Sequence, residues 1–136
     1  MTILHQASCV AINGRALMIE GPPGSGKSRL ALALIDRGAV LVGDDGVSLE
    51  ERGGRLYASP APATTGLLEV RNLGLLTYPT LSNVRVALVI RLDPEAPRFI
   101  DAAQQVDLHR AILPLVQLWP DPDAIKAELA LKRFGV

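Results

Sequence analysis

This sequence contains little cysteine and few aromatic residues, and neither positive nor negative charge is in excess. Its one cysteine, Cys9, cannot form a disulfide within the chain. Aromatic residues make up 4% of the chain, too few to build a platform on which nucleic-acid bases stack. Lys and Arg number 14, as do Asp and Glu, so no basic surface is indicated that would bind nucleic acid. These absences argue against nucleic acid as a main partner.

Long apolar runs are also missing. No run reaches the roughly 18 residues that a membrane span requires. The first ten residues lack the basic stretch followed by an apolar one that marks a secretory signal. We therefore expect a cytoplasmic protein with no membrane partner. The length predicts one domain, residues 1–136, with a single buried core and no separate N-terminal domain.

The pattern of apolar residues predicts strands and helices in alternation, which is typical of an α/β protein. Asn13-Gly14 indicates a hairpin turn that leads into a buried strand. The expected strands are 16–19, 40–42, 47–49, 56–57 and 84–92, and the expected helices start near Lys27 and span 121–134. Residues 59–66 read as a loop, and Pro114 and Pro120 are expected to break the segment that contains them.

The stretch GPPGSGKS matches the phosphate-binding loop pattern G-x4-G-K-[ST] in full. Glycines in such a loop let backbone N–H groups converge on phosphate oxygens, and the following helix adds a favourable potential. Lys27 would reach the β- and γ-phosphates, and the Ser28 hydroxyl would contact Mg²⁺. A turn that caps the helix and binds nothing is the alternative. The expected nucleotide-binding residues are Gly21, Pro22, Pro23, Gly24, Ser25, Gly26, Lys27, Ser28 and Arg29.

Two adjacent acids, Asp44 and Asp45, follow the strand expected after the loop helix. In a parallel α/β arrangement this strand ends on the same side as the loop, so the acids should lie near the phosphates. Adjacent strand residues point to opposite faces, so one acid is expected to face the nucleotide. It would accept a proton or hold a metal ion, although Asp-Asp-Gly is also an ordinary turn sequence.

Three ordered motifs resemble the catalytic core of HPr kinase/phosphorylase. The first runs from the loop through Arg37-Gly38 to Asp44-Asp45 without a gap, and the second is LLEVRNLGLL, residues 67–76. The third is His5, where that family has a histidine before its first core strands. The sequence differs from the family's usual residues at Gln6, Arg29 and Asn72, where Gly, Glu and Gly are common.

This resemblance implies a fold of the phosphate-loop kinase type, similar to phosphoenolpyruvate carboxykinase cores, with a mixed sheet and few helices. It implies an enzyme that uses ATP and Mg²⁺ to phosphorylate a serine of the carrier protein HPr and that also reverses this reaction. It further implies a tendency to form hexamers.

The resemblance also assigns roles to individual residues. Lys27 and Ser28 would serve the nucleotide, and Ser28, Asp44 and Glu69 would hold the metal. Asp44 and Asp45 together would supply the catalytic proton carrier, with Asp45 favoured, and His5 would support the catalytic site. Taken alone, His5 is equally well explained as a structural histidine. A kinase for small molecules and a non-catalytic nucleotide sensor remain the alternative functions.

Overall fold

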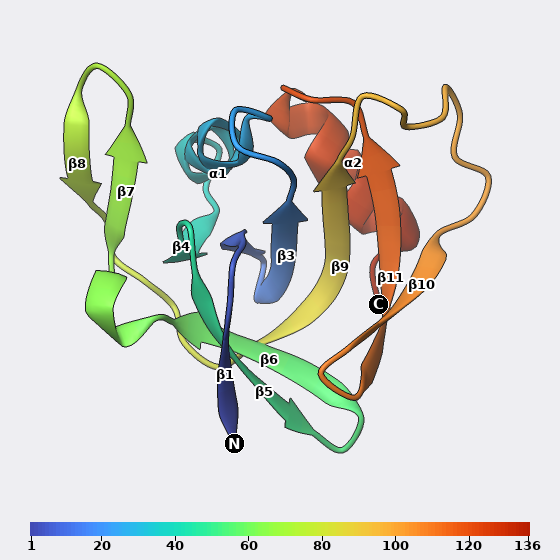
Figure 1. Ribbon diagram of the computed structural model, residues 1–136, viewed down its shortest axis with the longest axis horizontal. Coiled ribbons are helices and arrows are strands. Elements are labelled where there is room, and N and C mark those ends of the chain that lie inside the picture. The colour runs from blue at the N-terminus through green and yellow to red at the C-terminus, as the bar shows by residue number, and fades with distance from the viewer.

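The computed structural model describes residues 1–136 as a large mixed sheet with two helices and a separate hairpin (Figure 1). The nine strands of the large sheet are β1 (Thr2–His5), β2 (Ser8–Ile12), β3 (Arg15–Glu20), β4 (Val40–Gly43), β5 (Val47–Arg52), β6 (Arg55–Pro60), β9 (Val84–Leu92), β10 (Gln104–Leu108) and β11 (Ala111–Leu118). The helices are α1 (Lys27–Asp36) and α2 (Ala124–Phe134), and β7 (Leu67–Val70) pairs with β8 (Gly74–Thr77) alone. A short 3₁₀ turn, η1 (Pro62–Thr64), precedes that hairpin.

The strand directions bring four C-terminal ends to one edge of the sheet. β3, β9 and β11 are parallel neighbours. β2 pairs antiparallel with both β3 and β4, so β4 runs in the same direction as β3. The first residue after each of these four strands therefore lies at this edge. These residues are Gly21, Asp44, Asp93 and Trp119. The expected placement of the Asp44 pair on the side of the loop is confirmed, with β2 inserted between the two strands concerned.

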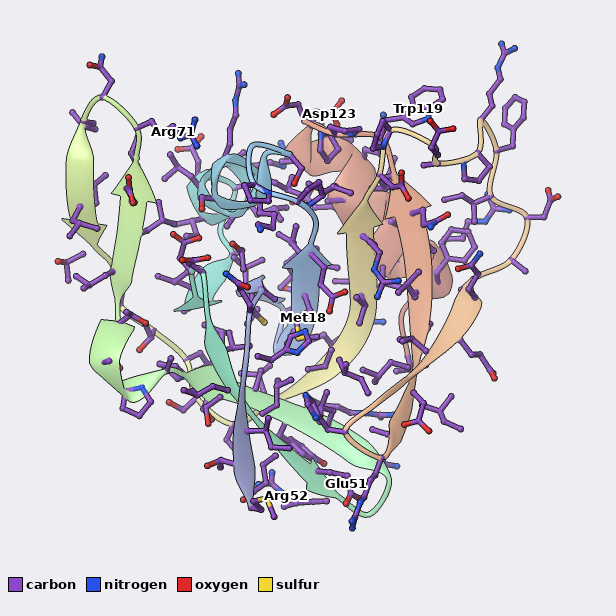
Figure 2. All side chains as sticks on the ribbon, in the orientation of Figure 1. Met18, Glu51, Arg52, Arg71, Trp119 and Asp123 are labelled. Atoms are coloured by element: carbon purple, nitrogen blue, oxygen red, sulfur yellow. The ribbon has the colours of Figure 1, made fainter.

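Two apolar clusters occupy the two faces of the sheet. Successive residues of β3 alternate between them: Leu17 and Ile19 belong to the cluster that both helices cover, and Ala16 and Met18 belong to the other. Met18 lies in the interior of the molecule (Figure 2). The length predicted one core, but strands that are apolar on both faces divide the buried residues into two clusters.

Most of the expected elements are confirmed. Strand 84–92 is β9, and the Asn13-Gly14 turn joins β2 to β3. Two expectations need correction. β6 extends through Pro60 and η1 follows, so residues 59–66 are only partly loop. Pro114 lies within β11 instead of breaking it. Pairing of β11 with β9 begins only at Leu115, so at Pro114 the strand pairs with β10 alone. The backbone N–H that proline lacks is therefore not needed there.

Each helix ends as its sequence suggests. Gly38, with φ +108°, follows α1 in a backbone conformation that favours glycine. Asp123 caps α2 by accepting a hydrogen bond from the Lys126 N–H at 2.8 Å, and Lys132 and Arg133 occupy its last turn. Neither helix is long and apolar enough to cross a membrane.

Candidate functional site

The phosphate-binding loop connects the end of β3 to the start of α1. Gly24 and Gly26 have φ of +81° and +98°, which turns the backbone toward the helix. No side chain caps α1, and its first turn holds no acidic residue, so its leading N–H groups are free for an anion. The Lys27 ammonium donates a hydrogen bond to the Gly21 carbonyl at 2.8 Å and so folds back over the loop.

Asp44 binds the loop helix directly. The Ser28 hydroxyl donates to Asp44 Oδ1 at 2.7 Å, and the Ser8 hydroxyl from β2 donates to the same oxygen at 2.9 Å. The Glu69 backbone N–H lies 3.4 Å from Asp44 Oδ2. Asp44 is 7% exposed, and these three hydrogen bonds replace those that its carboxylate would make to water. The carboxylate is thus held rigidly beside Ser28.

Asp45 has a different environment. It is exposed, adopts φ +58° in the turn after β4, and lines neither of the two clefts described below. The turn is tight, since a Cβ at Gly43 would lie 2.4 Å from the Gly46 carbonyl oxygen. Asp44 therefore faces the loop and Asp45 faces solvent, which agrees with the expectation that the two side chains point in different directions.

A cleft of about 600 Å³ lies beside the loop, and we call it the Lys27 cleft. One wall is the loop and the start of α1, and the other is β7 with Glu69 and Arg71. Figure 2 shows Arg71 between the β7–β8 hairpin and α1. The buried Leu68 side chain anchors β7 in the core that α1 covers. Asn72 at the hairpin turn has φ +68°, a conformation that Asn accepts more readily than most residues, which explains why it replaces a glycine here.

The residues of the Lys27 cleft fit a magnesium nucleotide. Its volume lies within the range of small-molecule sites, and the α1 N-terminus and Lys27 supply positive potential for phosphates. Ser28 and Glu69 line the cleft, and Asp44 contacts Ser28 from behind it; their side chains offer the hard oxygen atoms that Mg²⁺ prefers. No three His, Cys, Asp or Glu side chains gather as an all-protein metal site. Mg²⁺ commonly binds through one or two carboxylates together with substrate phosphates, so this donor set suits it.

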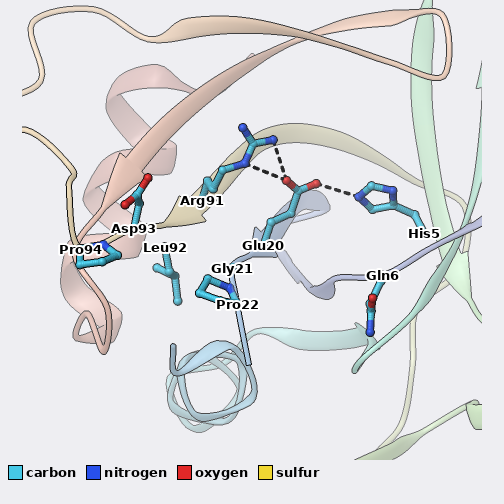
Figure 3. Close-up of a pocket in the computed structure, with 9 residues that line it drawn as sticks. All are labelled: His5, Gln6, Glu20, Gly21, Pro22, Arg91, Leu92, Asp93 and Pro94. Carbon is cyan, nitrogen blue, oxygen red and sulfur yellow. Dashed lines mark hydrogen bonds and ion pairs between the residues drawn. The ribbon is translucent and has the colours of Figure 1, made fainter. Parts of the chain in front are cut away.

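His5 lies apart from this cleft. It lines a second, polar cleft of about 530 Å³, the His5 cleft, together with Glu20, Arg91 and the first loop residues Gly21 and Pro22 (Figure 3). His5 Nε2 is 2.7 Å from Glu20 Oε2, and Arg91 donates two hydrogen bonds to Glu20 Oε1. Burial raises the pKa of Glu20, but the hydrogen bonds and charges of His5 and Arg91 outweigh it and lower the pKa below its usual value.

Sequence reasoning missed three polar residues of the site. Ser8 is fully buried within the strand that separates β3 from β4, and a lone hydroxyl in an otherwise apolar run was its only signal. Glu20 ends the apolar β3 directly before the loop. Asp121 donates its N–H to the Ser25 carbonyl at 2.9 Å, and its carboxylate lies against Gly26, where a Cβ would be 2.4 Å away. The sequence predicted Asp121 as the start of the closing helix, but α2 begins at Ala124 and Asp121 has φ +52° in the preceding turn.

Known proteins share both the sequence and the fold. Residues 1–93 match the family described as HPr Serine kinase C-terminal domain. The chain is 43% identical over 82 residues to an HPr kinase/phosphorylase of Clostridium tetani, covering 60% of this chain and 27% of the relative. For an HPr kinase/phosphorylase of an Exiguobacterium species, identity is 36% over 101 residues, with coverage of 68% and 32%. The chain thus spans about a third or less of these relatives.

A solved structure agrees over nearly the whole length. The Hpr(Ser) kinase/phosphatase from Coxiella burnetii superposes with a TM-score of 0.85, covering 96% of this chain and 94% of that one, at 23% identity. This similarity establishes the shared fold, an α/β kinase core with a mixed sheet and two helices. Together with the match over residues 1–93, it shows that the chain belongs to the family of HPr serine kinase C-terminal domains.

Proposed function

We propose that this protein is an ATP- and Mg²⁺-dependent kinase that phosphorylates a serine of an HPr-type carrier protein, and that residues 1–136 form its catalytic domain. One observation carries the proposal: the buried Asp44 carboxylate receives the Ser28 hydroxyl at 2.7 Å, beside a helix N-terminus without a side-chain cap. Family membership supports the reaction class. The reaction belongs in the cytoplasm, where ATP and an HPr-type carrier would be available.

The residues of the Lys27 cleft would bind the nucleotide. The loop N–H groups and the α1 N-terminus hold phosphate oxygens, and Lys27 exchanges the Gly21 carbonyl for the β- and γ-phosphates. Ser28, Asp44 and Glu69 would hold Mg²⁺. Mg²⁺ held there would supply positive charge that offsets the negative charge developing during transfer. Because transfer depends on position and charge, a rigid Asp44 is an advantage.

Asp45 would act on the acceptor. It is exposed at the turn beside Asp44, so the serine of a docked protein can approach it from solvent. As a general base it accepts the proton of the serine hydroxyl when the oxygen attacks the γ-phosphate and ADP leaves. In the reverse reaction it returns that proton to the serine oxygen while inorganic phosphate takes the phosphoryl group and forms pyrophosphate.

Transfer of labelled phosphate from ATP to the HPr-type carrier of the same organism tests this proposal. Wild type should label a carrier serine in the presence of Mg²⁺, and Lys27→Ala and Asp45→Asn should not. Binding of ATP without any labelled carrier would support a nucleotide sensor instead. Rapid phosphorylation of a nucleoside or sugar, with the carrier left unlabelled, would support a small-molecule kinase. Homo-oligomer formation remains a prediction from the resemblance, to be measured separately.

A further inference from the structure

Three charged or titratable side chains from three separate strands meet beside the first residue of the loop. His5 ends β1, Glu20 ends β3, and Arg91 lies near the end of β9. His5 Nε2 lies 2.7 Å from one Glu20 carboxylate oxygen. Arg91 donates from Nε at 3.2 Å and from Nη2 at 2.9 Å to the other oxygen (Figure 3). Both oxygens of Glu20 are therefore engaged, and the carboxylate is fixed in orientation.

The hydrogen bonds determine where the proton of His5 lies. An ionised carboxylate only accepts hydrogen bonds, so Nε2 must donate to Glu20. The Glu20 and His5 side chains are 14% and 20% exposed, so water competes only weakly for this bond. The hydrogen bond of the His5 ring within the protein is made through Nε2, which leaves Nδ1 open to an outside partner. The ring also packs edge-to-face against His109, with centroids 5.6 Å apart, which restrains it from a second side.

We propose that Glu20, clamped by Arg91, is a positioning residue that holds His5 with its proton on Nε2 and presents Nδ1 as a hydrogen-bond acceptor to the serine of the incoming protein. This inference rests on the proposed function. It also assigns the Lys27 cleft to the nucleotide and the His5 cleft to the acceptor protein. The acceptor would cover Asp45 as well, since His5 pairs with Val47, two residues after Asp45. Gly21 and Pro22 line the His5 cleft, and Gly24, Gly26, Lys27 and Ser28 line the Lys27 cleft, so both clefts border the loop.

The covalent link between Glu20 and Gly21 couples His5 to the loop. Glu20 is the last residue of β3, and the loop begins at the next peptide bond. A displacement of the loop on nucleotide binding would therefore move the anchor of His5 as well. The Lys27 ammonium holds the Gly21 carbonyl at 2.8 Å, and a turn of Lys27 toward phosphate would release this part of the loop. Glu20 thus connects the nucleotide side of the site to the acceptor side.

Proton NMR of His5 tests the positioning directly and needs no kinase activity. Wild type should show a downfield Nε2–H resonance, identified by its loss in His5→Gln and protected from exchange by the bond to Glu20. Glu20→Ala should abolish the resonance, and Glu20→Gln, which keeps an acceptor oxygen, should restore part of it. Glu95→Gln is the matched control, because Glu95 is exposed. A resonance that survives in Glu20→Ala would overturn the proposal.

Carrier phosphorylation tests the functional half. Glu20→Ala should lower the transfer rate at saturating carrier by about tenfold, the effect of losing one hydrogen bond to a charged group, while ATP affinity stays within about twofold. Glu20→Gln should recover part of the rate. Loss of the NMR resonance with an unchanged rate would show a purely structural cluster and overturn the role. If wild type transfers nothing, the proposed function fails, and the NMR result still decides whether Glu20 holds His5.

Discussion

The Ser28 hydroxyl donates a hydrogen bond of 2.7 Å to Asp44 Oδ1, across 16 residues of sequence and between a helix start and a strand end. This contact joins the phosphate-binding loop to the acidic pair. The serine hydroxyl of the phosphate-binding motif is the group that contacts Mg²⁺. The Asp44 carboxylate therefore lies where the metal ion is expected.

Asp44→Asn should weaken Mg²⁺-dependent ATP binding by about tenfold or more. The amide removes the charge beside Ser28 and turns one acceptor into a donor, which faces either the two hydroxyls or the Glu69 N–H. The free energy of unfolding should also fall by about 1–3 kcal/mol, because Asp44 is buried. Calorimetric titration and urea unfolding measure the two effects. Asp36→Asn, at an exposed position of α1, is the control. Unchanged ATP affinity would exclude a metal role for Asp44.

Asp45→Asn should lower the rate of carrier phosphorylation without changing the stability of the fold. Asp45 is exposed, so its replacement should leave the urea midpoint close to that of wild type. The rate of carrier phosphorylation should fall by about 10²–10⁴-fold, as expected for loss of a general base. A rapid-quench assay at saturating ATP measures the rate. Transfer at the wild-type rate would remove Asp45 from the mechanism and leave Asp44 as the proton carrier.

Lys27→Ala should reduce transfer by about 10²–10³-fold, the scale of losing one charged group that stabilises the transition state. The fold should persist, because the only hydrogen bond of the ammonium is to the Gly21 carbonyl. Circular dichroism and the transfer assay report on fold and activity separately. Lys132→Ala, on the exposed last turn of α2, is the matched control and should behave as wild type.

Stability should depend on pH through Glu20. Its pKa in the folded protein lies below the ordinary value of 4.5, so the folded state favours the ionised form. The stabilisation by Glu20 is therefore complete above pH 4.5 and disappears as the pH falls through the lower, folded pKa. Urea unfolding between neutral and acidic pH should show the advantage of wild type over Glu20→Gln shrinking on acidification. If wild type instead gained stability relative to Glu20→Gln as the pH falls, the pKa of Glu20 would be raised in the folded protein, not lowered.

Cys9 should resist thiol reagents in the folded protein. Burial raises the pKa of its thiol to about 12, so almost no reactive thiolate forms at neutral pH. Cys9 is also inaccessible, since its exposed fraction is 0%. Labelling with a maleimide should proceed only at the rate of unfolding and become fast in denaturant. Fast labelling without denaturant would show that β2 opens readily.

The phosphate-binding loop, α1 and the position of Asp44 were predictable because residues close together in the sequence determine them. Glycine spacing determines the loop, apolar spacing determines α1, and the order of helix and strand brings Asp44 back to Ser28. Ser8 and Arg91 could not be found in this way. Each becomes part of the site through strand pairing, β2 with β4 and β3 with β9, and the sequence alone does not specify strand order.

Pro114 and His5 show two further limits. Pro114 suggested a break, but β11 tolerates it because only one strand pairs there. His5 was expected to support the catalytic site, and that role stays a prediction. The sequence did not indicate that His5 lies in a second cleft across the loop from Lys27. Local sequence cannot distinguish the two sides of a loop, because each side is defined by strands far away along the chain.

Phosphorylation of the carrier, located by mass spectrometry, tests the central claim most directly. Wild-type protein, the HPr-type carrier of the same organism, ATP and Mg²⁺ are incubated, and the modified carrier residue is mapped. The account predicts one phosphate on a serine, absent with Lys27→Ala, Asp45→Asn or without Mg²⁺, and present with Lys132→Ala. An unmodified carrier, although ATP is bound and the protein is folded, would contradict it.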